Sequence, residues 1–148
     1  KLWQEGITIV SAGGNSGPER ETIKSPGVSR KIITVGGLDD NRDTLGNYNE
    51  RNFKVADFSS RGPAFNRIKP DVIAPSVNIT SCSHLGGYRQ MSGTSVATPM
   101  VAGLCALIYE KYPNAMPDQI KNFLIYNAKT IFKGKYAEGY GIVQFNLQ

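Results

Sequence analysis

The sequence has little of three features that often define a protein class: it contains two cysteines, one histidine and no long hydrophobic run. Two cysteines are too few for a disulfide framework, and their separation does not fit a metal-ligand motif. The longest apolar run, residues 100–109, is too short to cross a bilayer as a helix. The first ten residues lack the basic start, apolar stretch and small-residue cleavage site of a secretion signal.

The 148 residues suit one domain, and 40% hydrophobic with 20% charged residues is a globular composition. This composition excludes a wholly disordered or collagen-like chain. Lys and Arg number 17 and Asp and Glu 12, which gives a net charge of +5. The positive residues are scattered, apart from a group at Lys129, Lys133 and Lys135, and they form no basic stretch interleaved with aromatics. We therefore expect neither a nucleic-acid nor a membrane partner.

The two cysteines, Cys82 and Cys105, lie in different surroundings. Cys105 stands in an apolar stretch with helical spacing and is expected in the core as a small hydrophobic residue. A bridge between the two stays open, because only coordinates give their separation. The cysteine content favours a reducing, cytoplasmic compartment over a secreted one.

Short β-branched runs that end at glycine or proline predict the strands of a sheet. The expected strands are 6–12, 31–35, 71–74 and 77–82, with 140–145 as a final strand or extended tail. The first two of these each end at a Gly-Gly pair, which is expected to form a turn. The polar stretch 38–53 is expected to be an exposed connection.

Two helices are expected after the strands. Apolar residues follow helical spacing over 95–112, and they form a face wide enough for a fully buried helix, with Pro99 near the first turn. A second helix is expected to begin at Pro117, with Asp118 in its positive first turn. Strands mixed with helices predict an α/β layered fold.

The segment 92–99 (SGTSVATP), at the start of the first expected helix, is the one best suited to chemistry. A serine on a glycine-flanked turn at a helix start projects from a rigid core, beside N–H groups that lack partners within the helix. Ser95 is therefore a candidate nucleophile, and its own N–H is a candidate donor to an oxyanion. The alternative is that Thr94 or Ser95 only caps the helix.

Four segments follow one another along the chain: 12–17, 57–63, 69–75 and 93–99. In sequence and in order, they resemble motifs of the subtilisin-like serine peptidases (subtilases). Residues 93–99 (GTSVATP) resemble the nucleophile motif of that family, and 12–17 (AGGNSG) resemble its oxyanion-hole segment, with Asn15 at the asparagine position. Residues 57–63 (DFSSRGP) and 69–75 (KPDVIAP) resemble the two segments usually found between them. The resemblance covers nearly the whole chain.

The resemblance implies a three-layer subtilisin-like α/β fold with a mostly parallel sheet, of which only the C-terminal part is present. Residues 1–148 would then be the C-terminal portion of one subtilase catalytic domain. It further implies a serine endopeptidase of the peptidase S8 type, which hydrolyses peptide bonds through an acyl-enzyme. The implied catalytic residues are Ser95 as nucleophile and Asn15 in the oxyanion hole, and the implied substrate-binding residues are Ser11, Ala12, Gly13, Gly14 and Thr94.

The chain departs from the family in lacking motifs for the triad aspartate and histidine. In subtilases these precede the oxyanion asparagine, and here only fourteen residues precede Asn15. The one histidine, His84, does not match the family position and is expected to be an exposed loop residue. A serine without a base is a weak nucleophile, so the chain alone should be nearly inactive. The alternatives are a pseudo-peptidase acting as a binding or regulatory module and a stand-alone α/β interaction domain.

Further expectations concern ligands and partners. By resemblance Lys24 falls near the floor of the pocket for the side chain before the cut, where it either favours acidic side chains or faces solvent. Ser25–Pro26 matches a site where the family often has a cis proline. No cofactor is required. Calcium is an additional candidate at Asp39, Asp40 and Asp43, although these residues lack regular ligand spacing and suit a polar loop.

The expected partners are a polypeptide substrate and the missing N-terminal part of the same domain. A sheet cut through its middle would expose a strand edge and apolar faces, so self-association of the fragment is also expected.

Overall fold

The computed structural model describes residues 1–43, 45–131 and 133–145. The chain order of elements is η1 (Leu2–Glu5), β1 (Val10–Ala12), β2 (Ile33–Asp39), η2 (Glu50–Asn52), β3 (Lys54–Val55), β4 (Val72–Pro75), β5 (Ile79–Cys82), β6 (Tyr88–Met91), α1 (Thr94–Lys111), α2 (Pro117–Tyr126) and α3 (Lys135–Glu138), where η marks a 3-10 helix.

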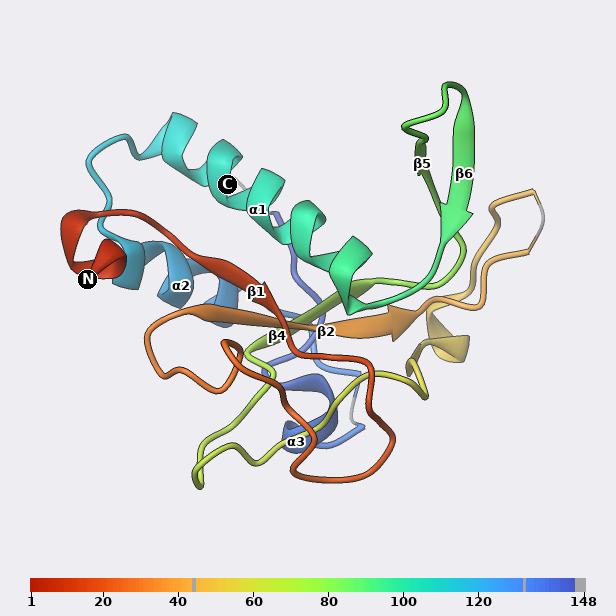
Figure 1. The fold of residues 1–148 in the computed structure, drawn as a ribbon, viewed down its shortest axis with the longest axis horizontal. Coiled ribbons are helices and arrows are strands. Elements are labelled where there is room, and N and C mark those ends of the chain that lie inside the picture. Colours follow the sequence, from red (N-terminus) through yellow and green to blue (C-terminus); the bar gives the residue numbers. More distant parts are fainter. Residues whose placement is uncertain (44, 132, 146–148) are drawn as a thin grey trace.

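The main sheet is built around β2, the longest strand (Figure 1). Strand β1 pairs with it in parallel, with Val10 opposite Ile33, and β4 pairs in parallel along its other edge, with Val35 opposite Val72. The short strand β3 pairs antiparallel near the end of β2. The sheet is thus mostly parallel, as expected.

The sheet is covered on both faces, which gives three layers. Helices α1 and α2 pack with β1, β2 and β4 in the larger core cluster, which includes Val35, Val101 and Leu124. A smaller cluster around Ile73 on β4 joins Ala137 of α3 and Ile142 of the C-terminal segment. In Figure 1, α1 lies above the sheet and α3 below it. The predicted three-layer α/β fold is confirmed.

The prediction that β2 would stop at the Gly36–Gly37 pair was wrong. The strand continues through both glycines to Asp39, because they provide close packing and not a turn. A Cβ on Gly36 would come 2.7 Å from a ring carbon of Pro70, and one on Gly37 would come 2.5 Å from the hydroxyl of Ser76. Glycine is used here so that β4 and the segments around it can approach the backbone closely.

A strand was predicted at 77–82, and β5 occupies Ile79–Cys82, but its partner β6 was not predicted. The two strands form a separate hairpin that projects from the body in Figure 1, with Ile79 opposite Met91 and Cys82 opposite Tyr88. Every residue of β6 is exposed. The segment therefore has no alternation of buried and exposed residues by which its strand could be predicted.

Helix α1 was expected to be buried on all sides, and the structure corrects this. Its inner face is buried, as shown by Ala97, Val101 and Ile108, whereas Met100 and Leu107 are exposed. The described residues therefore cover only one side of an apolar helix. Among these residues, no helix is both long and apolar enough to cross a membrane. Helix α2 begins at Pro117, as predicted.

Candidate active site

The fold brings Asn15 and Ser95 to the same place. Asn15 follows the carboxyl end of β1 by three residues, and Ser95 is the second residue of α1. Helix α1 packs directly on β1, and in Figure 1 its first turn lies beside the tip of that strand. Asn15 and Ser95 are both exposed.

Thr94 fixes the orientation of the Asn15 amide. Its backbone N–H and its hydroxyl each donate a hydrogen bond of 2.9 Å to Asn15 Oδ1. The hydroxyl also accepts a 3.3 Å bond from the N–H of Gly14. Because the amide oxygen is held by two donors, the Nδ2 donor group must point the other way. Thr94 belongs to the expected substrate-binding set, and its buried side chain contacts the Asn15 amide.

Gly93 shows how closely the two functional groups converge. A Cβ built on Gly93 would lie 3.3 Å from Asn15 Nδ2 and 3.3 Å from Ser95 Oγ. The amide and the hydroxyl therefore flank one small space, which a side chain at position 93 would enter. Gly93 has φ 148° and ψ 158°, a region that is essentially restricted to glycine. It is also the N-cap residue of α1, so the alternative that Thr94 or Ser95 only caps the helix was wrong.

Replacing Gly93 with alanine should reduce the stability of the fold. The strained backbone predicts a loss of about 1–3 kcal/mol in the free energy of unfolding. The new methyl group would also crowd the space between amide and hydroxyl. The matched control is Gly103→Ala in the same helix, where a Cβ meets nothing within 4 Å. That control should gain up to about 1 kcal/mol, because alanine favours a helix interior. Thermal melts of both variants measure this, and equal melting temperatures would contradict it.

The segment 57–63 supports the loop that bears Asn15, a role that its sequence alone does not reveal. The N–H of Gly17 donates to the carbonyl of Phe58 at 2.8 Å, and the N–H of Ser60 donates to that of Gly14 at 2.9 Å. The hydroxyl of Ser60 accepts a 3.0 Å bond from the N–H of Ser16, and Ser60 is fully buried. Backbone hydrogen bonds thus hold the loop on both sides of Asn15.

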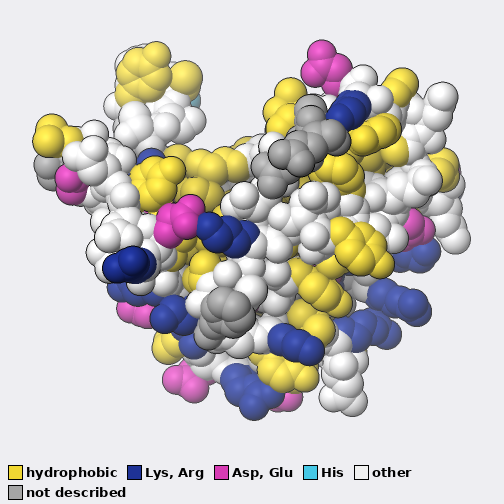
Figure 2. All heavy atoms as spheres, turned by 180° about the vertical axis from the view of Figure 1, so that it is seen from behind, with side chains coloured by type: hydrophobic (Ala, Val, Ile, Leu, Met, Phe, Trp, Pro, Cys, Tyr) yellow, Lys and Arg dark blue, Asp and Glu magenta, His cyan; other side chains and the backbone are white. Residues whose placement is uncertain are grey.

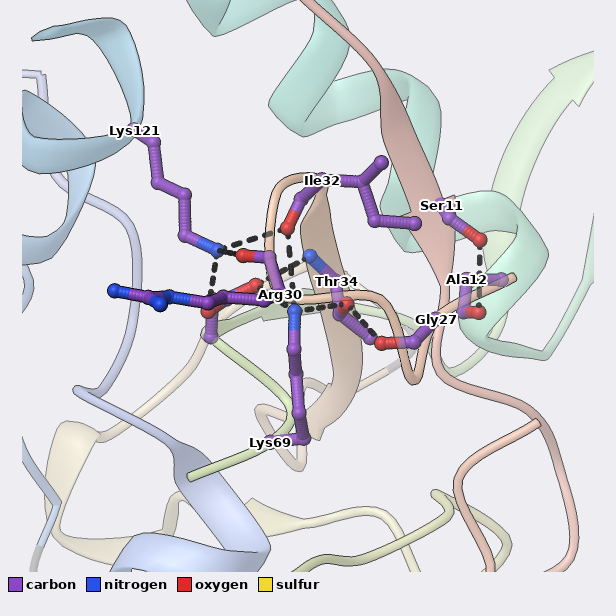
Figure 3. A network of polar contacts seen from close by, with 9 residues as sticks. Ser11, Ala12, Gly27, Arg30, Ile32, Thr34, Lys69 and Lys121 are labelled. Carbon is purple, nitrogen blue, oxygen red and sulfur yellow. Dashed lines mark hydrogen bonds and ion pairs between the residues drawn. The ribbon is translucent and has the colours of Figure 1, made fainter. Parts of the chain in front are cut away.

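Residues 11–14 form the end of β1 and the start of this loop. Figure 3 shows Ser11 and Ala12 on the strand, where the Ser11 hydroxyl donates to the Ala12 carbonyl at 3.2 Å. Gly13 is buried and its N–H donates to Val35. A Cβ on Gly14 would lie 2.8 Å from Cγ of Lys24, so the stem of that exposed lysine covers the glycine. The Ser25–Pro26 bond is cis, as expected.

The one histidine lies away from Ser95. His84 is exposed in the turn of the β5–β6 hairpin, beyond the last strand pair, whereas Ser95 follows the opposite end of that hairpin. Cys82 is exposed and Cys105 is buried, and both are free thiols, so the bridge left open by the sequence does not form. Burial raises the pKa of the Cys105 thiol to about 11.

The segment 69–75 is anchored by a buried ionic network that the sequence did not predict (Figure 3). Lys69 is 1% exposed, and its Nζ donates to Asp71 Oδ2 and Thr34 Oγ1, both at 2.7 Å. Lys121 from α2 binds the other oxygen of Asp71 at 2.9 Å. The N–H of Thr34 donates to Asp71 Oδ2 at 2.7 Å. The network ties the starts of β2 and β4 to α2, and so fixes the sheet from which the site projects.

The network predicts a stability change and a pH dependence. Lys69→Met should lower the free energy of unfolding by about 2 kcal/mol. This is less than the about 3–5 kcal/mol of a fully broken buried pair, because Lys121 still neutralises Asp71. The control is Lys54→Met, whose exposed pair with Asp39 contributes about 1 kcal/mol or less.

Burial is the main cause that lowers the pKa of Lys69 from 10.5 to about 8, with the charge of Asp71 opposing it. Between pH 8 and 10.5 the unfolded chain therefore holds a proton that the folded protein has released. The contribution of Lys69 to the free energy of unfolding should rise with pH across this window. Chemical denaturation of wild type and Lys69→Met at several pH values measures this, and equal pH slopes would contradict it.

The three aspartates considered for calcium each have a partner within the chain. Asp39 pairs with Lys54, Asp40 pairs with Arg42, and Asp43 accepts hydrogen bonds from the backbone and side chain of Asn47. These hydrogen bonds lower the pKa of Asp43. Within the described residues, no three His, Cys, Asp or Glu side chains are grouped as metal ligands.

Comparison with known proteins shows the family and the fold of this chain. Residues 2–142 match the profile of the Subtilase family (Peptidase S8), so the chain belongs to that family. It is 45% identical over 139 residues to serine protease AprX of Bacillus subtilis (strain 168), which covers 84% of this chain and 30% of AprX. It is 38% identical over 148 residues to subtilisin of Bacillus sp. (strain TA39), which covers 94% of this chain and 34% of that protein.

Solved structures show the same fold. The TM-score is 0.82 to sphericase, at 34% identity, and 0.84 to the S41 psychrophilic protease, at 31% identity. Each comparison covers 97% of this chain and 50% of the solved chain. The chain thus has a subtilisin-like fold, and it spans about a third of the two curated relatives and half of these two structures.

Proposed function

We propose that this chain supplies the nucleophile and the oxyanion asparagine of a serine endopeptidase. The observation that carries the proposal is that Asn15 Nδ2 and Ser95 Oγ flank one space beside Gly93. Ser95 Oγ attacks the carbonyl carbon of the peptide bond while its proton passes to a general base. The C–N bond then breaks, the amine leaves with that proton, and water hydrolyses the acyl ester to free Ser95.

The oxyanion formed in the attack would accept hydrogen bonds from Asn15 Nδ2 and from the N–H of Ser95. The Ser95 N–H lies in the first turn of α1, where N–H groups have no acceptor within the helix and the helix dipole favours negative charge. One such donor is worth about 2.7–4 kcal/mol of transition-state stabilisation. Thr94 contributes by holding the amide in the donating orientation before substrate arrives.

The general base and its aspartate belong, in this proposal, to an N-terminal part of the same catalytic domain. Supporting this, the chain spans half of the similar solved structures, and its one histidine is at the far end of a hairpin from Ser95. The exposed side of α1 and the outer edge of β1 are the surfaces on which that part would pack. The chain by itself would then be nearly inactive. The proposal also includes a polypeptide as the substrate and the cytoplasm as the location of the protein.

The test is labelling of the complete protein, including the sequence upstream of Lys1, with a serine-directed fluorophosphonate. The proposal predicts one adduct, which peptide mass spectrometry places on Ser95 and which Ser95→Ala abolishes. The 148-residue chain alone should label far more slowly, because it lacks the base. A folded, complete protein that does not label would favour the pseudo-peptidase alternative, as would an upstream sequence with other residues at the triad positions.

A further inference from the structure

A hollow of about 830 Å³ lies near the starts of the parallel strands, at the opposite end of the sheet from the candidate active site. It opens between α2 and the segment 66–69, at the edge where the parallel strands β2 and β4 begin. Asn15 and Ser95 lie at the opposite edge, where β1 ends. Figure 2 shows Lys and Arg side chains gathered over the right-hand and lower part of the back of the molecule.

The wall of this hollow has an excess of positive charge. Its cationic residues are Arg30, Lys31, Arg67, Lys69 and Lys121, against two carboxylates, Asp71 and Asp118. Both carboxylates already have partners in the fold. Asp71 lies between Lys69 and Lys121, and Asp118 accepts a 3.2 Å bond from the Trp3 indole and faces Lys31 at 3.7 Å. The hollow therefore has three positive charges more than it has negative ones.

The side chains of two of these cations make no hydrogen bond or ion pair with the described part of the chain. Within the described part of the chain, neither the Arg30 nor the Arg67 guanidinium has a hydrogen-bond or ion-pair partner. Figure 3 shows the Arg30 side chain running out past the Lys121 ammonium, away from the buried network, so that both cations lie on the same side. A guanidinium presents a planar fork of donors that fits a carboxylate through two parallel hydrogen bonds.

The remaining lining suits a polypeptide. Asn66 and Asn122 add side-chain amides, which can both donate to and accept from a peptide backbone. Ile68 and Ile125 provide apolar surface for the stems of side chains. We propose that this hollow is an exosite for an acidic segment of a polypeptide, whose Asp or Glu carboxylates pair with Arg30 and Arg67. The cations line a recess and not a long track, which favours a peptide over a nucleic acid.

Fluorescence anisotropy with a short, labelled, glutamate-rich peptide tests this site on the purified protein. The same peptide with glutamine at every glutamate gives the neutral comparison, and a single-stranded oligonucleotide of equal charge gives the polyanion comparison. The double variant Arg30→Ala/Arg67→Ala should raise the Kd for the acidic peptide about tenfold, the effect of losing two partly exposed charge pairs. The control Arg51→Ala/Arg89→Ala removes the same charge at two exposed arginines elsewhere and should leave the Kd unchanged.

Thermal melts should show that both double variants stay folded, since none of the four guanidinium groups has a partner in the described fold. Hydrolysis of a short neutral substrate by the complete protein should be unchanged in either double variant, which separates the exosite from the active site. Equal loss in the two double variants would overturn the proposal, because the effect would then be one of net charge. Equal binding of the neutral peptide, or tighter binding of the oligonucleotide, would overturn it as well.

Discussion

Replacing Ser95 with alanine is expected to abolish peptide-bond hydrolysis by the complete enzyme. The expected fall in kcat is about 10⁶-fold, the size known for loss of the nucleophile in a subtilisin. The reason is that no acyl-enzyme forms without the hydroxyl oxygen, so only binding and oxyanion stabilisation remain. Steady-state kinetics on a chromogenic peptide measure the effect.

The fold should tolerate this change, because the Ser95 side chain is exposed and the Thr94 bonds to Asn15 stay in place. An unchanged melting temperature would verify that. Ser29→Ala is the matched control, since Ser29 is exposed before β2 and its hydroxyl makes no hydrogen bond to the described residues. Comparable activity of Ser95→Ala and Ser29→Ala would exclude Ser95 as the nucleophile.

Replacing Asn15 with alanine is expected to cause the second largest loss of activity. We expect kcat to fall by about 10²–10³, with little change in KM, the size known for an oxyanion-hole asparagine in a subtilisin. The effect falls on kcat because the donor binds an oxygen that becomes negative only in the transition state. Burst and steady-state kinetics on the complete enzyme give both constants.

The variant Asn15→Asp separates the hydrogen bond that Asn15 would donate to the oxyanion from the hydrogen bonds with Thr94 that hold its loop. An aspartate oxygen can still accept the bonds from the Thr94 N–H and hydroxyl, so the loop should keep its place. The other oxygen, however, would replace the Nδ2 donor with a negative charge that repels the oxyanion. We expect Asn15→Asp to be at least as inactive as Asn15→Ala while melting at a temperature closer to that of wild type. An active Asn15→Asp variant would show that the amide donor has no role in catalysis.

Local signals in the sequence predicted the elements that present the site. Pro117 marked the start of α2 because its missing N–H is harmless at the first helical position. The spacing of Ala97, Val101 and Ile108 predicted α1 because these residues form one face of a helix. Spacing could not show how much of the helix would be covered, since burial of Met100 and Leu107 depends on what packs outside it.

The contacts that orient the site could not be predicted, because each joins residues far apart in the chain. Thr94 meets Asn15 across 79 positions, and nothing next to either residue signals the other. Lys69 and Asp71 are near neighbours in sequence, but Lys121, which completes their network, comes from a helix much further along the chain. The Gly36–Gly37 pair has the composition of a turn, and only the close approach of Pro70 and Ser76 explains its place within a strand.

The central claim is that a hydroxyl and an amide from distant parts of the chain act on one carbonyl oxygen. A crystal structure of the complete protein after fluorophosphonate treatment tests it most directly. We predict that phosphorus is bonded to Ser95 Oγ and that the phosphoryl oxygen accepts hydrogen bonds from Asn15 Nδ2 and the Ser95 N–H. An adduct on another residue, or a phosphoryl oxygen turned away from Asn15, would contradict the claim.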